Sequence, residues 1–160
     1  MIPQIGTGSA GDGAHRVRVT TVLGDRDGAV GTSWVTAIST PSAGHSPFVV
    51  LARPNLPVVP LTLFVPAAAI AGPQHLELTH GAAHAGVAAA VLDLQMDDPD
   101  GELCLIASVW VDPAAASIDE VYQHTHDATV LSLKMGAGAG PWHGHLLEVE
   151  LPENDHFRPS

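Results

Sequence analysis

Hydrophobic and polar residues are distributed along the chain in a way that predicts about four β-strands. Residues 15–23 contain the alternating run RVRV and end before Gly24 and the turn sequence DRDG, which is typical of a strand and its exit. Residues 48–52 and 61–65 are short apolar runs. Residues 103–111 form a continuous apolar run, which is typical of a strand covered on both faces.

Three other stretches predict helices. Residues 29–39 predict a short helix, and residues 81–95 have the alanine content of a longer one. Gly86 weakens that helix by about 1 kcal/mol relative to Ala, so we expect a close packing contact at this position. The last helix is predicted to start with Asp112 as its cap and Pro113 in its first turn, and to stop at Gly136.

Glycine-rich ends bound a single predicted domain. Residues 1–13 are rich in Gly and Ser and residues 136–144 are rich in Gly, which favours poorly specified or connecting segments. A length of 160 residues is enough for one domain with a real core. We therefore expect an N-terminal tail at 1–10, a domain at 11–135, and a connection with a C-terminal tail at 136–160.

The sequence RPNLP at residues 53–57 follows a predicted strand and restricts the path of the chain. Its two prolines fix their own backbone angle φ, and each biases the residue before it toward an extended conformation. This predicts a rigid exit from the strand, and such loops often border a pocket. Ordinary turn chemistry is the alternative interpretation.

The composition limits both the kind of core and the kind of partner. Hydrophobic residues make up 46% of the chain but aromatic residues only 4%, so the core must consist of small aliphatic side chains. The formal charge of -11, from 6 basic and 17 acidic residues, argues against binding to nucleic acid or to an anionic membrane. Such a core suits helices packed closely on a sheet.

The remaining compositional signals favour a cytoplasmic protein. The single cysteine, Cys104, lies in an apolar run and is expected to be a small buried hydrophobic residue with a raised thiol pKa. The N-terminus lacks the basic and apolar regions of a signal peptide, and no run reaches the length of a membrane span.

The chain has ten histidines, and three spacings raise the question of a metal site. His80 and His84 are four residues apart and could share a helix face. His124 and His126 are two apart on the last predicted helix and point in different directions. His143 and His145 lie in the Gly-rich region without a neighbouring carboxylate or thiol. We expect no metal and interpret these side chains as solvated or satisfied by local hydrogen bonds.

Common catalytic motifs are absent from the sequence: it contains no GxSxG elbow, phosphate-binding Gly loop or HExxH helix. No cofactor is evident from the residues. A function therefore has to be inferred from a pattern that is specific to one protein family.

Such a pattern extends from residue 11 to about residue 133. Its parts keep one order, with a spacing that is free of gaps to about residue 93 and then needs one deletion around residues 97–101, and together they resemble the formaldehyde-activating enzyme family. The matching residues are GDG at 11–13, LG at 23–24, Arg26, RPNLP at 53–57, Pro60, TL at 62–63, GVA at 86–88, AV at 90–91, DAT at 127–129 and LS at 131–132.

The resemblance implies both an architecture and a reaction. The family's fold is an α+β domain of the ribosomal protein S5 domain 2-like type, assembled as a homopentamer with its site in clefts between subunits. Family members condense formaldehyde with tetrahydromethanopterin, which is a carbon–nitrogen lyase reaction. A pterin amine adds to the aldehyde, and the product loses water when its hydroxyl is protonated, a step suited to a general acid such as His. Tetrahydromethanopterin or a related pterin is implied by this resemblance alone.

At the positions of the family's site, this chain carries different residues. The proton-donating His of the family falls on Arg18, and a following Asp falls on Thr20. An apolar contact falls on Val49, while a Lys and a Thr that help to hold the pterin fall on Ala67 and Ala69. Arginine stays protonated in proteins, so Arg18 could hold an anion or a carbonyl oxygen but cannot serve as a proton donor.

Histidines replace further family residues. A site-lining Gln of the family falls on His84, and two tyrosines of its last helix fall on His124 and His126. We hypothesise that His84 is the acid or base and that Arg18 anchors an anionic or carbonyl group. Thr20, Val49, Ala67, Ala69 and His124 are the expected substrate-binding residues.

Two functions follow from this pattern. One is a carbon–nitrogen lyase or condensing enzyme for a small carbonyl or amine substrate, and it predicts that His84 and Arg18 converge in a cleft. The other is a noncatalytic binding or structural protein on the same oligomeric scaffold, in which these side chains do not converge.

Overall fold

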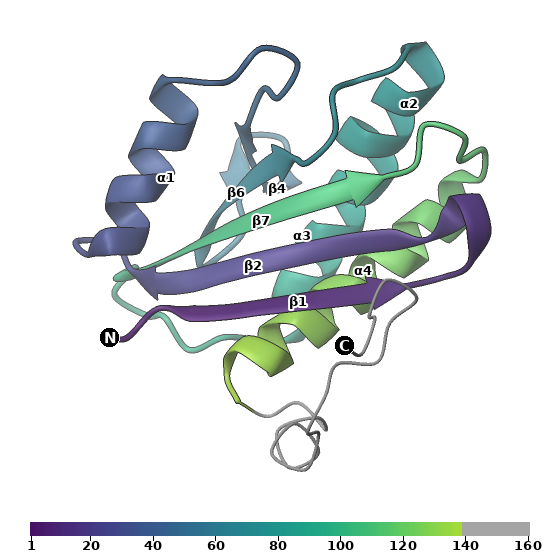
Figure 1. The fold of residues 1–160 in the computed structure, drawn as a ribbon. Coiled ribbons are helices and arrows are strands. Elements are labelled where there is room, and N and C mark those ends of the chain that lie inside the picture. The colour runs from purple at the N-terminus through teal and green to yellow at the C-terminus, as the bar shows by residue number, and fades with distance from the viewer. Residues whose placement is uncertain (139–160) are drawn as a thin grey trace, which may run out of the picture.

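The chain forms a mixed sheet with helices on both faces, as the computed structural model shows for residues 1–138 (Figure 1). The sheet has five strands in the order β1-β2-β7-β6-β3. Neighbours are antiparallel except β6 and β7, which are parallel. The strands are β1 (Gln4–Ala10), β2 (Val17–Asp25), β3 (Phe48–Val49), β6 (Leu61–Pro66) and β7 (Leu103–Val111).

The helices cover the sheet on both of its faces. Helix α1 (Ala29–Ser39) lies on one face of the sheet. The other face carries α2 (Pro73–Glu77), the π-helical segment η2 (Leu78–Ala83), α3 (His84–Asp93) and α4 (Ile118–Gly136). A 3-10 turn η1 (Gly13–His15) connects β1 to β2. Parallel strands need a crossover connection, and the run from α2 to α3 supplies it between β6 and β7.

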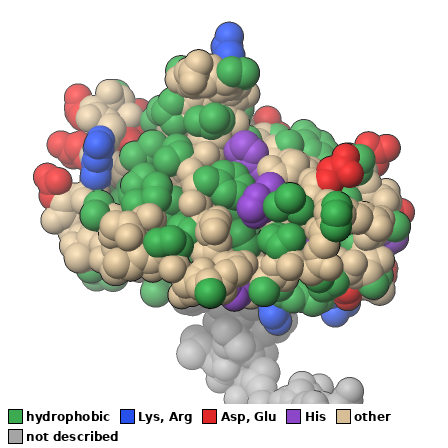
Figure 2. Space-filling model, turned by 90° about the horizontal axis from the view of Figure 1, so that it is seen from above, with side chains coloured by type: hydrophobic (Ala, Val, Ile, Leu, Met, Phe, Trp, Pro, Cys, Tyr) green, Lys and Arg blue, Asp and Glu red, His purple; other side chains and the backbone are tan. Residues whose placement is uncertain are grey.

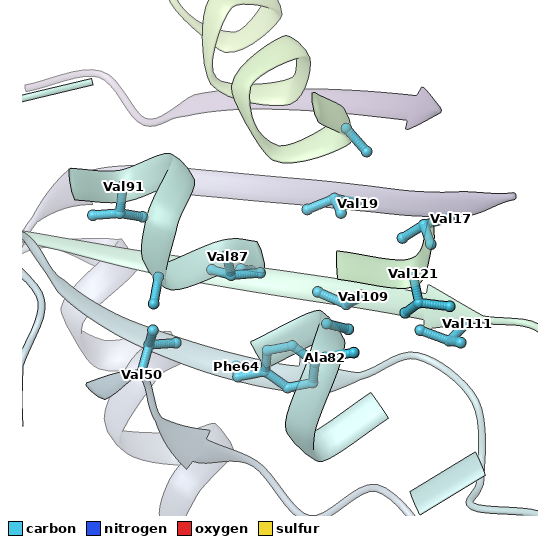
Figure 3. Packing of buried hydrophobic residues seen from close by; sticks show 14 of the residues in the cluster. Val17, Val19, Val50, Phe64, Ala82, Val87, Val91, Val109, Val111 and Val121 are labelled. Atoms are coloured by element: carbon cyan, nitrogen blue, oxygen red, sulfur yellow. The ribbon is translucent and has the colours of Figure 1, made fainter. Parts of the chain in front are cut away.

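The main core lies between the sheet and the helices α3 and α4. Valines of β2 and β7 face valines of α3 and α4 across this layer (Figure 3). Val19, Val87, Val109 and Val121 are 0% exposed, and each such side chain contributes about 1.5–3 kcal/mol by leaving water. Small branched side chains suit this close layer, so the low aromatic content has a structural reason.

The prediction of an N-terminal tail at residues 1–10 is wrong, because Gln4–Ala10 forms the edge strand β1. Its small residues are explained by α4, which lies directly against the strand backbone. A Cβ atom on Gly6 would lie 1.9 Å from the carbonyl oxygen of Ser132, and one on Gly8 would lie 2.1 Å from that of Ala128. The glycines that resembled a flexible segment therefore allow a helix to pack at close range.

The predicted strands are confirmed in position, with one interruption. Residues 48–52 divide into β3 and a separate strand β4 (Leu51–Arg53), which pairs with β5 (Leu56–Pro57) in a small hairpin. The predicted rigid exit at residues 53–57 is thus the turn of this hairpin, where Asn55 takes a left-handed conformation with φ of 62°. Two strands, β1 and β5, were missed.

The start of the last helix also differs from the prediction. Helix α4 begins at Ile118, and its cap is Ser117, whose side chain accepts a hydrogen bond from the Glu120 amide (3.3 Å). Asp112 instead closes a preceding turn by accepting from the amide of Ala114 (2.8 Å). The sequence Ser117 to Glu120 has the S-x-x-E spacing of a capping box, which is the stronger start signal. Gly136 is the last residue of α4, close to the predicted stop.

The helix predicted at residues 81–95 starts earlier than expected, because helical structure begins at Pro73 and continues through η2 into α3. The expected close contact at Gly86 is confirmed: a Cβ atom there would lie 2.5 Å from the carbonyl oxygen of Tyr122 on α4. In the part of the chain that the structure describes, no helix combines the length and apolar character needed to cross a membrane. Apart from residues 136–138, the predicted C-terminal tail lies outside the described residues.

Replacing Gly86 with Ala is expected to destabilise the fold by roughly 1–3 kcal/mol, because the added carbon overpacks the contact between α3 and α4. The free energy of unfolding in chemical denaturation measures this effect. Gly81→Ala is the matched control, since a Cβ there meets nothing within 4 Å. It should leave stability unchanged or raise it by up to about 1 kcal/mol. A Gly86→Ala protein as stable as the parent would contradict the close-packing interpretation.

Candidate functional site

The sheet presents one face to α3 and α4 and the opposite face to α1, and within residues 1–138 helix α1 covers only part of that second face. Helix α1 packs over the end of that face where Gly24 lies opposite Cys104, and a Cβ atom on Gly24 would be 2.5 Å from the Val30 side chain. The other end of the same face carries Arg18, which is exposed. We call this part of the sheet the uncovered end.

Arg18 lies between two strands at the uncovered end. Its register partners are Ser9 on β1 and Trp110 on β7, so the three side chains share one face of the sheet. The Arg18 guanidinium carbon lies over the Trp110 ring, 5.9 Å from its centroid. Among residues 1–138, Arg18 forms no ion pair with a carboxylate. Its charge is therefore available to an anionic ligand.

Two other predicted site residues lie next to Arg18 or next to its partner Trp110. Thr20 is two residues further along β2 on the same face, opposite Ser108, and its hydroxyl is 3.0 Å from that of Thr7. Ala67 follows β6, and its amide donates to the carbonyl of Val109 (2.8 Å), which places it next to Trp110 in the adjacent strand. Thr20 is thus a neighbour of Arg18, whereas Trp110 on β7 lies between Arg18 and Ala67.

The other residues predicted to bind substrate lie further from Arg18. Val49 lies opposite Leu63, on the same face of the sheet but further from Arg18. Ala69 is an exposed loop residue beside Gly44. His124 lies on the helical side, where its Nδ1 is 2.8 Å from the carbonyl oxygen of His15 in the turn between β1 and β2. That local contact separates His124 from the uncovered end.

His84 lies on the helical side of the sheet, at the first residue of α3. Its Nε2 accepts a hydrogen bond from the Leu51 amide (3.1 Å), at the start of the small hairpin. The rings of Phe48 and Phe64 lie 5.2 Å and 6.4 Å from its ring centroid, both in edge-on orientation. Burial lowers the pKa of His84, and the neighbouring His80 lowers it further.

The hydrogen bond to Leu51 decides which nitrogen of His84 carries the proton. Because Nε2 accepts, the neutral ring must carry its hydrogen on Nδ1. Nδ1 has no hydrogen-bond partner among the described residues, and the His84 side chain is only partly buried. His84 therefore offers a ligand an N–H donor and has no vacant nitrogen lone pair.

Two further histidines precede His84 along the same helical run. His75 and His80 are five residues apart, the spacing of an i→i+5 turn, and η2 lies at this point. His75 is buried, with Nδ1 accepting from the Ala71 amide (3.0 Å) and Nε2 lying 3.0 Å from the carbonyl oxygen of Val111. Burial and the nearby His75 lower the pKa of His80, whose buried Nε2 has no partner among the described residues.

Arg18 and His84 do not converge within one chain, because they lie on opposite faces of the same sheet. Sequence reasoning missed Trp110 and Ser108, the β7 residues that border Arg18 and Thr20. A signal for both existed: Val109 and Val111 are core residues, so strand alternation places Ser108 and Trp110 on the other face. What the sequence lacked was the pairing of β7 with β2.

Histidines reach the surface in the middle of a largely neutral region, with acidic side chains toward its two sides (Figure 2). Within residues 1–138, no group of three or more His, Cys, Asp or Glu side chains is arranged to hold a metal ion. His124 and His126 face different neighbours, as predicted: His124 contacts the β1–β2 turn, whereas His126 contacts Asp93. His143 and His145 lie outside the described residues.

Cys104 behaves as the sequence predicts. It is buried, its sulfur lies 3.7 Å from the carbonyl oxygen of Gly24, and burial raises the pKa of its thiol. A thiol held protonated in this way is a poor nucleophile. Cys104 is therefore part of the packing beneath α1.

An acidic notch of about 710 Å³ lies away from the predicted site. It contains no residue of the uncovered end and no histidine; its lining residues are Asp25, Arg26, Asp27, Gly28, Asp100, Gly101 and Glu102. Among the described residues, the uncovered end differs from this notch in holding a cation without a carboxylate partner, and His84 in holding an N–H donor without an acceptor.

Comparisons with known proteins identify relatives of this chain. A family model described as formaldehyde-activating enzyme (Fae) matches residues 5–156, a longer span than the resemblance at 11–133. The chain is 33% identical over 150 residues to a bifunctional enzyme Fae/Hps of Methanosarcina barkeri, covering 91% of this chain and 38% of the relative. A bifunctional enzyme Fae/Hps of Methanococcoides burtonii is 34% identical over 142 residues, covering 86% and 36%. The chain thus spans little more than a third of these relatives' lengths.

His126 is expected to make the stability of the fold depend on pH. Its Nδ1 lies 2.9 Å from Asp127 and its Nε2 lies 2.9 Å from Asp93 at the end of α3. The hydrogen bond to Asp127, followed by the one to Asp93, raises the pKa of His126. A raised folded-state pKa means that the stabilisation is complete below the unfolded value of about 6.5 and is lost as pH rises through the folded value.

Thermal unfolding of the parent and of His126→Gln at pH 5.5 and pH 9 tests this. The parent should melt higher than the variant by on the order of 1–3 °C at the lower pH, with a smaller difference at the higher pH. Asp93→Asn should also lower the melting temperature at pH 5.5, by less than His126→Gln does. A melting-temperature difference between parent and His126→Gln that grows with pH would contradict the raised pKa of His126.

Proposed function

Because this chain belongs to the formaldehyde-activating enzyme family, we propose that it condenses a small carbonyl compound with the amine of a pterin-type substrate. The reaction forms a carbon–nitrogen bond with loss of water and is a lyase reaction in reverse. The observation that carries this proposal is the family match over residues 5–156, which includes β1, the uncovered end and the helix of His84. The family resemblance adds an S5 domain 2-like fold, a homopentamer and a cytoplasmic location to the proposal.

In this function His84 donates a hydrogen bond from Nδ1 to the oxygen of the reacting carbonyl or carbinolamine. A neutral imidazole fits this role, because burial lowers the pKa of His84 and the Leu51 amide already points at Nε2. If Nε2 were protonated, its N–H would point at the N–H of Leu51, and the two donors would repel each other. The geometry therefore favours a hydrogen-bond donor over the general acid or base suggested by the sequence.

Arg18 supplies a fixed positive charge in this function, with Thr20 beside it and Ala67 on the far side of Trp110. A guanidinium cannot return a proton at neutral pH, so its contribution is to hold an oxygen or an anion. Ala67 and Ala69 offer no polar side chain, which leaves binding at this end to Arg18, Thr20, Ser108 and Trp110.

A site that uses both Arg18 and His84 requires two copies of the chain. Within one copy the sheet separates them, so the proposed active site combines the uncovered end of one copy with the His84 face of another. The separation inside one chain is also the observation that favours the alternative, a noncatalytic binding or structural protein on the same oligomeric scaffold.

Native mass spectrometry with formaldehyde and tetrahydromethanopterin, followed by the rate of methylene-pterin formation above the uncatalysed background, tests the proposed function. We expect an oligomer that retains the pterin and accelerates the reaction. An oligomer with neither bound pterin nor acceleration by any aldehyde would support the noncatalytic alternative instead.

Two substitutions of His84 distinguish hydrogen-bond donation from proton transfer. His84→Gln keeps an N–H donor and should retain the rate to within about tenfold, whereas His84→Ala should lose about 10²-fold, the effect of removing one such donor. The parent rate should fall only as pH drops below the ordinary His value of about 6.5, since the depressed pKa keeps the ring neutral above it. Equal losses in both variants would favour proton transfer by His84.

A further inference from the structure

The uncovered end holds an anion-binding group whose position is set by the sheet. Arg18 and Trp110 are register partners in an antiparallel pair, and the guanidinium carbon lies 5.9 Å from the indole centroid. A guanidinium held over an aromatic face keeps its N–H groups available to an acceptor, and it is more ordered than a free surface arginine. This arrangement suits a planar carboxylate, which can accept two parallel N–H bonds.

The electrostatic setting of Arg18 is unusual for this chain. The protein has 17 acidic and 6 basic residues, yet no carboxylate of the described residues pairs with Arg18. Neighbouring Arg16, by contrast, lies 4.0 Å from Asp12. The register partners of Arg18 are the neutral residues Ser9 and Trp110, and the next residues on the same face, Thr20 with its partners Thr7 and Ser108, carry hydroxyl groups. An anion bound by Arg18 would therefore have neutral, hydroxyl-bearing side chains nearby.

We propose that the aldehyde used by this protein carries a carboxylate and that Arg18, positioned by Trp110, binds it. This inference rests on the proposed function and specifies its substrate class as small oxo acids, of which glyoxylate is the simplest. Formaldehyde has one neutral oxygen and gives a guanidinium no anion to hold. An oxo acid offers two carboxylate oxygens beside the reacting carbonyl.

The chemistry of the bond-forming step is unchanged by the carboxylate. The amine nitrogen adds to the aldehyde carbon, the carbonyl oxygen takes up one proton as the nitrogen releases one, and a carbinolamine forms. Loss of its hydroxyl as water then takes up one further proton and leaves a positively charged iminium, which becomes a methylene-type bridge when a second amine nitrogen adds to its carbon and releases one proton. The carboxylate keeps its charge throughout, so a permanently protonated arginine suits it better than a group that titrates.

Binding can be measured without turnover through the indole N–H signals of the full-length chain in nitrogen–proton correlation spectra. Trp110→Phe identifies the signal of Trp110. Glyoxylate should shift this signal in a saturable way, whereas glycolaldehyde, a neutral aldehyde of similar size, should not. Arg18→Gln should weaken glyoxylate binding by about tenfold or more, the usual effect of losing a charge-assisted hydrogen bond. Arg16→Gln is the matched control and should bind like the parent.

Rates with tetrahydromethanopterin then establish which substrate Arg18 binds. If it holds the aldehyde's carboxylate, Arg18→Gln should reduce kcat/KM for glyoxylate about tenfold more than kcat/KM for formaldehyde. If it holds an anionic group of the amine substrate, both values fall equally, and the inference is overturned while the proposed function stands.

Other results distinguish a failure of the carboxylate inference from a failure of the proposed function. Equal signal shifts with glyoxylate and glycolaldehyde, or unchanged binding in Arg18→Gln, would also overturn the inference. Acceleration with neither aldehyde would remove the proposed function, and the binding spectra would still decide whether Arg18 recognises a carboxylate.

Discussion

The direct packing of α4 on the backbone of β1 is the contact on which the arrangement of this domain depends. Gly6 and Gly8 leave no room for a side chain beneath the helix. The helix therefore comes close enough for the Ser132 hydroxyl to donate to the Gly6 carbonyl (2.8 Å) and to lie 2.7 Å from the Thr21 hydroxyl. These buried hydrogen bonds join β1, β2 and α4, and a shift of register would leave their polar atoms unpaired.

With the register of β2 set in this way, strand alternation assigns every polar group to a side of the sheet. Val17, Val19 and Thr21 face the helices, so Arg18 and Thr20 must face away. Helix α1 covers the far face only around Gly24 and Cys104. The chain consequently keeps a cation and several hydroxyls on one surface and its histidine-bearing helix on the other, and any chemistry that needs both requires a second copy.

The helical run from Pro73 to Asp93 controls the chemical state of its histidines through burial and backbone contacts. The π-helical segment changes the periodicity of the run between His75 and His84. At its end, the hairpin strand β4 brings the Leu51 amide to Nε2 of His84. A backbone donor of the small hairpin therefore selects the tautomer of a side chain on a distant helix. The rigid segment noted in the sequence thus borders this histidine rather than the arginine.

By itself, the sequence determined most secondary structure, the small aliphatic core, the buried state of Cys104 and the family. These properties follow from periodicity, composition and ordered motifs, which are local or additive along the chain. Only the tertiary structure decided that residues 4–10 form a strand, because Gly and Ser favour a loop until a helix packs on them. It also decided that Arg18 meets Trp110 and that His84 lies on the opposite face. Those relations depend on strand pairing between residues about 90 positions apart, and no local pattern encodes such a pairing.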